Sequence, residues 1–192
     1  MDAPDVSSIE SRMQDRLPGR LFEHSRRVAR LAAQLAGLHG SNVDWIYLAG
    51  LYHDLGKTLD LAQMRATADR GEIPFDDLES DSPSLLHSAA SAALFRIELE
   101  APDKFVRAVR GHTIGGAPFC REEQILYIAD FSEPGRTHEE CETVRRMAQD
   151  NLVQAALETV IFKLRFLMLR QKSIHPRSVA LYNFLLKEST PA

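Results

Sequence analysis

Apolar residues recur at intervals of three and four positions along most of the chain, which is the spacing of one face of an α-helix. The most regular stripe consists of Leu21, His24, Val28, Leu31, Leu35 and Leu38. Similar patterns predict helices over residues 41–54, 58–70, 82–99, 102–111, 122–131, 151–172 and 176–187, and one that opens at 137. No alternating apolar segment lies between hairpin turns, so no strand is expected. The pattern therefore predicts an all-α fold, a single compact bundle of eight or nine helices.

Local signals mark several ends of these helices. Ser41 and Thr137 are each followed three positions later by an acidic residue, which is the pattern of a capping box at a helix start. Gly56 and Gly71 follow apolar periodic segments and are read as C-terminal caps. The segment 113–119, with the sequence TIGGAPF, is expected to be a loop.

Length and charge narrow the class of protein. The chain has 192 residues, of which 44% are hydrophobic and 26% are charged, an ordinary globular composition. We expect one domain over residues 20–187, preceded by an extension or short helix at 1–19. Lys and Arg number 23 against 27 acidic residues, a net charge of −4. No overall basic field favours nucleic acid or an anionic membrane, so an anionic substrate would need a local group of cations.

Cysteine usage and the absence of long apolar runs suggest the compartment. Cys120 and Cys141 make no disulfide framework and no paired thiolate zinc site, so we expect free thiols in a reducing cytoplasm. The polar N-terminal sequence lacks the apolar core of a secretory signal. No run of 18 apolar residues predicts a membrane span.

Six histidine and aspartate side chains fall on or at the ends of five predicted helices, facing the interior. They are His24, His53, Asp54, His87, His112 and Asp130. Asp130 lies in phase with Leu126, and a buried carboxylate is costly unless it is paired or bound to a metal. Two interpretations stay open on these residues alone: separate core histidines with buried ion pairs, or one metal centre. The other histidines, His39, His138 and His175, adjoin helix ends and are expected at the surface.

The donor types favour particular ions if a metal is bound. Histidine with carboxylate and no thiolate suits iron, manganese or zinc rather than calcium or magnesium alone. Six donors exceed the needs of one tetrahedral zinc with an open position. They suit two metals that share a bridging carboxylate, an arrangement used in the displacement of phosphate esters.

The ordered set H…HD…H…H…D resembles the signature of HD-domain metal-dependent phosphohydrolases. More closely, the chain resembles the YqeK family of symmetrical diadenosine tetraphosphate hydrolases. The stretches that carry this resemblance are YHDLGK at 52–57, LLH at 85–87, AVRGHTIG at 108–115, ILYIADFSEPGR at 125–136 and IHPRSVALYNFLL at 174–186. The resemblance covers about residues 20–187. One departure is Gly116, where the family often has an arginine.

The resemblance implies an all-α HD fold with a binuclear centre that contains iron, with manganese or another transition metal as the alternative. It implies that the six residues above are metal ligands, with Asp54 as the bridge. It also implies hydrolysis of diadenosine tetraphosphate, or a related dinucleoside polyphosphate, to two ADP. A water or hydroxide between two metals is nucleophilic at neutral pH and would attack phosphorus in line with the departing ADP oxygen.

Phosphoryl transfer requires mostly positioning and neutralisation of charge, so cations near the six residues are candidate phosphate contacts. Lys57, one turn after the His-Asp pair, is the first, and Arg136 in the SEPGR turn is the second. With Asp54 they form the predicted catalytic set. Arg27, Arg110 and Thr113 are further candidates for substrate binding. For each cation the alternative is an ordinary solvated or helix-capping role.

Aromatic residues near the C-terminus give no separate sign of base binding. Tyr182 and Phe184, and the set Phe162, Phe166 and Met168, are expected to pack in the core. Two other functions remain open on the sequence: another HD phosphohydrolase that acts on nucleoside mono- or triphosphates, and a non-catalytic nucleotide-binding helical module. The oligomeric state, a dimer included, is also left open.

Overall fold

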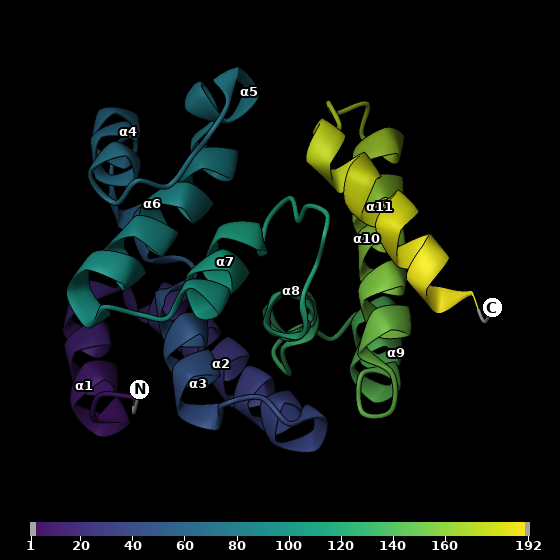
Figure 1. Cartoon of the computed structure of the whole chain (residues 1–192), viewed down its shortest axis with the longest axis horizontal. Coiled ribbons are helices and arrows are strands. Elements are labelled where there is room, and N and C mark those ends of the chain that lie inside the picture. The colour runs from purple at the N-terminus through teal and green to yellow at the C-terminus, as the bar shows by residue number, and fades with distance from the viewer. Residues whose placement is uncertain (1–2, 191–192) are drawn as a thin grey trace.

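The structure is a computed structural model that describes residues 3–190, and those residues are helical with no strand, as predicted (Figure 1). The α-helices are α1 Val6–Arg16, α2 Gly19–His39, α3 Val43–Tyr52, α4 Leu61–Arg70, α5 Asp77–Ser80, α6 Pro83–Leu99, α7 Asp103–Gly111, α8 Arg121–Ser132, α9 Glu139–Met147, α10 Leu152–Leu169 and α11 Pro176–Ser189, with the 3-10 helix η1 at Leu55–Thr58. The described part thus has eleven α-helices rather than eight or nine, because α1 and the four-residue α5 add to the nine periodic segments.

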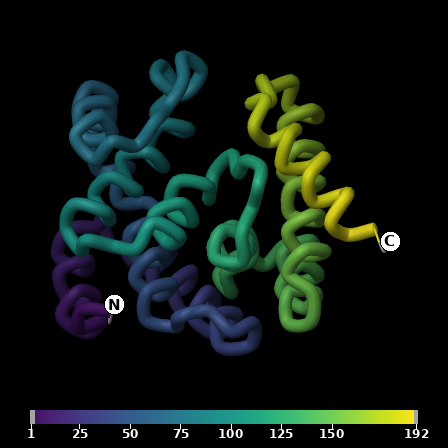
Figure 2. Tube along the Cα trace, viewed as in Figure 1, coloured from purple at the N-terminus to yellow at the C-terminus, as the bar shows by residue number. Residues whose placement is uncertain are grey.

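Helix α8 lies between two groups of helices. In Figure 1 it is seen almost end-on, with α1 to α7 on one side and α9 to α11 on the other. It packs against α2 and α7 in the first group and against α9 and α10 in the second. Figure 2 shows that the first and last helices, α1 and α11, lie at opposite sides of the molecule.

An aromatic cluster forms the part of the core between α3, α6 and α7. The Trp45 ring is stacked on Phe105 with centroids 6.1 Å apart and meets Phe95 edge-on at 6.2 Å. Tyr52, also fully buried, lies 5.2 Å from Phe95. Aromatic pairs of this kind add about 0.5–1.5 kcal/mol each beyond their area burial. Through Tyr52, this cluster holds the C-terminal end of α3, the end that is followed by His53 and Asp54.

Several predicted helix ends are wrong by a few residues, for local reasons. Helix α3 is capped by Asn42, whose side chain accepts from the Trp45 N–H, while Ser41 donates to Glu122. Helix α4 begins after Asp60 rather than at Thr58, because Asp60 forms the capping box. The N-cap of α9 is His138 and makes no side-chain capping bond, so the predicted capping box at Thr137 is absent.

The end of α10 also differs from the prediction. Phe162 stacks on Phe131 with ring centroids 6.0 Å apart, and Tyr182 and Phe184 are partly buried against the core. Phe166 and Met168, in contrast, are 56% and 60% exposed, so the prediction that they pack in the core is wrong. No helix within residues 3–190 is long and apolar enough to span a bilayer. Cys120 and Cys141 are both free thiols.

Candidate metal centre

The six predicted histidine and aspartate residues come from five separate elements and meet in one cluster. His24 lies on α2, His87 on α6 and Asp130 on α8, while His53 follows α3 and His112 follows α7. Asp54 is the residue before η1. His24, His53 and Asp130 each place a ligand atom within 4.8 Å of the others, and His53, Asp54 and His112 do the same.

Asp54 lies at the middle of this cluster, with its two oxygens facing different pairs of histidines. Its Oδ1 lies 3.2 Å from His87 Nε2 and 3.5 Å from His112 Nε2. Its Oδ2 lies 3.4 Å from His53 Nε2 and 3.7 Å from His24 Nε2. The Asp54 carboxylate thus divides the cluster into two halves and belongs to both.

Asp130 completes the half that contains His24 and His53. Its Oδ1 is 3.3 Å from His24 Nε2 and 3.8 Å from His53 Nε2. One half therefore offers two imidazoles and two carboxylates, and the other offers two imidazoles and one carboxylate. Each half has three or more nitrogen and oxygen donors, which is enough to hold a transition metal.

All four imidazoles use the outer ring nitrogen, Nδ1, to bond to fixed acceptors. His53 Nδ1 donates to Gly50 O at 2.7 Å and His112 Nδ1 donates to Val109 O at 2.7 Å. His87 Nδ1 lies 3.3 Å from Pro83 O, and His24 Nδ1 lies 3.2 Å from Glu133 Oε1. Because a carbonyl oxygen only accepts, the proton is on Nδ1 and the lone pair of Nε2 points inward. Outer-shell bonds of this kind fix the tautomer of metal-binding histidines.

The inward atoms are poorly satisfied by one another. His53 Nε2 and Asp54 Oδ1 are buried without a hydrogen-bond partner among the described residues. His87 Nε2 and His112 Nε2 lie 3.1 Å apart, and with both Nδ1 atoms protonated this contact joins two lone pairs. Buried acceptors without donors cost about 1–3 kcal/mol each. A cation between these atoms would satisfy all of them, so the donor set fits divalent metal ions.

Electrostatics within the cluster favour neutral His112 and ionised carboxylates. Burial, with the neighbouring charges of His53 and His87, lowers the pKa of His112 to about 4. Burial opposes ionisation of Asp54, yet the imidazoles of His53, His112 and His87 around it hold the pKa of Asp54 well below its usual range. The pKa of Asp130 is likewise lowered by its bond with His24 and by the charge of Lys163, despite burial. Deprotonated imidazole and carboxylate are the forms that bind metals.

Two of the predicted phosphate contacts lie at the exposed rim of the cluster. Lys57 Nζ is 2.6 Å from Asp54 Oδ2, and its side chain is 45% exposed. Arg136 Nη2 is 3.2 Å from Asp130 Oδ1, and its side chain is 42% exposed. Thr113 Oγ1 also adjoins the cluster, 3.0 Å from His112 Nε2. All three side chains thus contact cluster residues at the edge of the cluster.

Two other predicted contacts are engaged elsewhere. Arg27 bonds to Glu133 through Nε at 2.5 Å, beside the metal cluster. Arg110 is buried away from the rim, where it donates to Pro74 O and Glu79. The prediction that His175 lies at the surface is wrong, because it is 6% exposed and pairs with Asp76 at 3.0 Å.

Glycine 56 allows η1 to bring Asp54 close to His87. A β-carbon at this position would overlap the His87 carbonyl oxygen, and the Gly56 N–H donates to Ser91 Oγ at 2.8 Å. The backbone of η1 therefore lies directly against α6. The predicted C-cap role of Gly56 is wrong, and its small size is needed for this close approach.

Two residues near the cluster were not predicted from the sequence. Glu133, 3% exposed, joins His24 Nδ1 to Arg27, whereas the sequence showed it only as part of a helix-breaking turn. Lys163, on α10, donates to His112 O at 3.1 Å and lies 3.7 Å from the centre of the Tyr127 ring. Burial lowers the pKa of Lys163 to about 8. Nothing local in the sequence distinguishes Lys163 from other lysines on helices.

Replacement of Glu133 by alanine is expected to weaken metal binding by about 10- to 100-fold, because loss of such outer-shell partners has effects of this size. Metal content after dialysis against a graded series of free metal would measure the change. Glu133→Gln, which keeps an acceptor for His24, should lose less metal affinity than Glu133→Ala. Glu139→Gln, on the exposed start of α9, is the matched control and should bind metal as tightly as the wild type. Equal metal affinity in the wild type and all three variants would show that Glu133 does not support metal binding.

Comparison with known families defines the class of this fold and site. The family model of the HD domain matches residues 21–134, a range that contains all six cluster residues. A solved structure from Clostridium acetobutylicum, described as a predicted HD superfamily hydrolase involved in NAD metabolism, has a TM-score of 0.88 over 98% of this chain and 100% of that chain at 24% identity. The all-α bundle is thus the HD fold. HD domains are metal-dependent, which agrees with the donor set described above.

Similar sequences narrow the class further. A symmetrical bis(5'-nucleosyl)-tetraphosphatase of Halalkalibacterium halodurans is 32% identical over 168 residues, covering 87% of this chain and 89% of the relative. A protein of the same description from Staphylococcus aureus is 29% identical over 186 residues, covering 94% of both chains. The chain belongs to the HD-domain family and, within it, to the family of the symmetrical bis(5'-nucleosyl)-tetraphosphatases.

Proposed function

We propose that this protein hydrolyses diadenosine tetraphosphate, and related dinucleoside polyphosphates, symmetrically to two ADP. The observation that carries the proposal is the convergence of four imidazole Nε2 atoms and two carboxylates, among which His53 Nε2 and Asp54 Oδ1 are buried without a hydrogen-bond donor. The family to which the chain belongs supplies the substrate class. The reducing cytoplasm is the proposed compartment, in keeping with the two free thiols.

The proposed metal ligands are the six cluster residues, arranged for two ions. His87, His112 and Asp54 Oδ1 would hold one ion. The second would be held by His24, His53, Asp130 and Asp54 Oδ2, so that Asp54 is the bridge. Histidine and carboxylate together suit iron, with manganese or another transition metal as the alternative.

The chain's own residues would position the phosphates and balance their charge. When bound, the metal ions supply Lewis acidity and lower the pKa of a coordinated water. Lys57 and Arg136 lie at the rim with exposed side chains, where their cationic groups would meet phosphate oxygens. Arg136 offers a planar guanidinium that suits bidentate contact with phosphate. If the rim holds one ADP half of the substrate, the anhydride bond beyond the second phosphate of that half would lie at the metal centre. Hydrolysis of that bond would give two ADP, which is a symmetrical cut.

Product analysis tests the proposed reaction. Metal-loaded protein is incubated with diadenosine tetraphosphate, and the nucleotides are separated by chromatography. We expect ADP as the only product. Release of AMP with ATP would overturn the symmetrical cut, and hydrolysis of nucleoside mono- or triphosphates alone would assign the protein to another HD phosphohydrolase activity. Binding of the dinucleotide by metal-free protein, with no turnover by the loaded protein, would indicate a non-catalytic module.

The role of Lys57 is tested by its replacement with alanine. We expect a loss in turnover of about a hundredfold, because one charge-stabilising contact is commonly worth that much in rate. Metal content should change little, since Lys57 contributes no metal ligand. Steady-state rates, metal content and melting temperature would be measured on one preparation.

A matched control for Lys57 is Lys172→Ala, which removes an exposed lysine after α10. If Lys57 only stabilises η1, its loss would cost under about 1 kcal/mol of stability and leave rates nearly intact. Unchanged rates with a slightly lower melting temperature would therefore assign the phosphate contact to Arg136 instead.

A further inference from the structure

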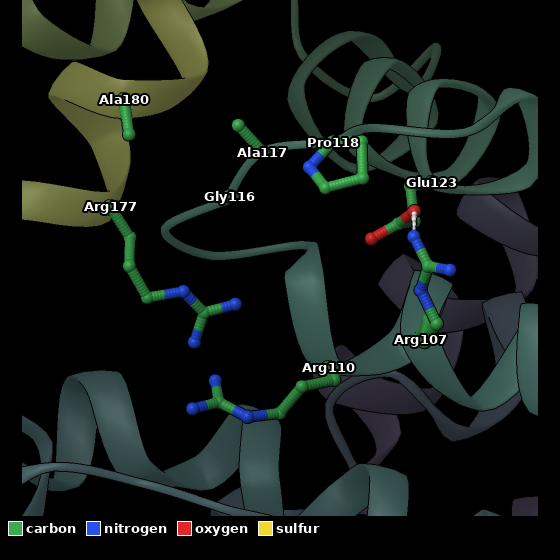
Figure 3. A pocket seen from close by; sticks show the side chains of 8 residues that line it. All are labelled: Arg107, Arg110, Gly116, Ala117, Pro118, Glu123, Arg177 and Ala180. Atoms are coloured by element: carbon green, nitrogen blue, oxygen red, sulfur yellow. Dashed lines mark hydrogen bonds and ion pairs between the residues drawn. The ribbon is translucent and has the colours of Figure 1, made fainter.

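A cavity separate from the metal cluster is lined by three arginines. Its volume is about 390 Å³, and its walls include Arg107, Arg110, Arg177, Gly116 and Glu123. Figure 3 shows Arg177, from α11, and Arg110, from α7, extending their guanidinium groups toward each other across the open space. Arg107 lies on the far side, joined to Glu123.

Two of these arginines are already engaged by protein acceptors. Arg107 Nη2 bonds to Glu123 Oε2 at 2.6 Å. Arg110 is nearly buried and donates to Pro74 O, Ser88 Oγ and Glu79, the last from Nη2 to Oε2 at 2.7 Å. Their guanidinium groups are thereby held in place, and they keep positive charge at the walls of the cavity.

Arg177 differs from these two arginines. Among the described residues its one carboxylate partner is Glu79, at 3.9 Å, and Glu79 is already bound by Arg110. The nearby Asp76 carboxylate is held by His175 at 3.0 Å. Burial and the charge of Arg110 lower the pKa of Arg177, while Glu79, Asp76 and Glu123 oppose this. Two guanidinium groups thus face each other with one shared carboxylate, and an anion between them would relieve their repulsion.

The backbone at Gly116 leaves room for the Arg177 side chain. Gly116 has φ of +156°, and a β-carbon there would lie 3.2 Å from Arg177 Nη2 and 3.4 Å from Nε. A larger residue at 116 would crowd the guanidinium and narrow the cavity. The side chain of Arg177 remains 37% exposed, so its donors are open to a ligand.

Short segments of chain connect this arginine cavity to the candidate metal centre. His112, a cluster residue, and Gly116, in the cavity wall, are four positions apart in the chain. Their Cα atoms are therefore at most about 14 Å apart. On the other side, Arg110 Nη1 donates to Ser88 Oγ at 3.2 Å, and Ser88 follows His87 in α6. A substrate that is cleaved at the metal centre and carries phosphates on both sides of the cut would therefore lie near both sites.

We propose that the arginine cavity binds phosphate groups of the second nucleotide half of the substrate, with Arg177 as the main contact. This inference rests on the proposed function, because it assumes a dinucleoside polyphosphate. A guanidinium that has no close partner of its own suits bidentate binding of phosphate oxygens. Arg177 is thereby assigned as a binding residue that distinguishes dinucleotide from mononucleotide ligands.

The test compares Arg177→Gln with wild type in turnover of diadenosine tetraphosphate and in binding of ADP to the metal-loaded protein. We expect KM to rise about tenfold with kcat within about twofold, as for loss of a contact made equally in ground and transition states. Arg177→Lys should show a smaller rise, because lysine keeps the charge without the bidentate geometry. Arg165→Gln, which removes an exposed charge on α10, is the matched control.

The outcomes separate this inference from the proposed function. Wild-type protein that produces no ADP would overturn the proposed function, whatever Arg177 does. Wild-type turnover with unchanged KM in Arg177→Gln would overturn the inference alone. Unchanged KM with loss of one ADP site in the binding experiment would also overturn it, and would assign the cavity to a separate nucleotide. Melting curves of all three variants would establish that they fold.

Discussion

Replacement of Asp54 by asparagine is expected to reduce hydrolysis to under about one-hundredth of the wild-type rate, because a direct ligand should matter more than its outer-shell partners do. The carboxylate is 2% exposed and faces all four imidazoles, with one oxygen toward each pair. Loss of its charge would remove the proposed bridge and release metal. The helical fold should persist, because Asp54 lies before a 3-10 helix and outside the aromatic core.

Rates, bound metal and far-ultraviolet circular dichroism on the same preparation would measure this prediction. Asp69→Asn is the matched control, since Asp69 is an exposed aspartate near the end of α4. Turnover and metal content near the wild-type values in the Asp54 variant would contradict the assignment of a binuclear centre bridged by Asp54. Loss of helical signal would show that Asp54 is needed for folding, and His53→Ala would then serve as the second variant.

Removal of metal by a chelator is expected to abolish activity and lower the melting temperature. Bound ions stabilise the folded state by about 2.7 kcal/mol for each site when free metal is a hundred times its Kd. Without the ions, the inward atoms of His53 and Asp54 are left without partners. Re-addition of iron(II) without oxygen, or of manganese, should restore most activity.

Magnesium or calcium alone should restore less activity than iron or manganese, because imidazole-rich sites suit transition metals. Full hydrolysis by rigorously metal-free protein would be incompatible with the proposed centre. An unchanged melting temperature after chelation would show that the cluster does not depend on ions for its stability.

Much of the fold was predictable because its long helices are amphipathic. The stripe from Leu21 to Leu38 corresponds to α2, and the predicted 82–99 segment corresponds to α6 at Pro83–Leu99. Helix α5 was missed because four residues are fewer than the turns needed to show a periodic pattern. The helix from 151 was predicted to end three residues too late, because its last turns carry apolar residues that are exposed.

The six cluster residues were predicted as a group from their order along the chain and the family resemblance that this order carries, while periodicity alone marked His24 and Asp130 as polar residues on apolar stripes. Their surroundings were not, since they depend on contacts between distant segments. Glu133 reaches His24 across 109 positions, and Lys163 reaches His112 across 51. Arg110 was predicted as a phosphate contact from its place two residues before His112, but its side chain bonds to Glu79 on α5, the helix that the pattern did not reveal.

The most direct measurement of the central claim is activity as a function of metal bound per chain. Metal-free protein is titrated with iron(II) without oxygen, and bound metal and the rate of ADP formation from diadenosine tetraphosphate are measured at each step. Since Asp54 joins two halves, each with its own pair of imidazoles, we expect the rate to reach its plateau at two ions per chain. A plateau at one ion per chain, or a full rate with none, would contradict the two-metal centre.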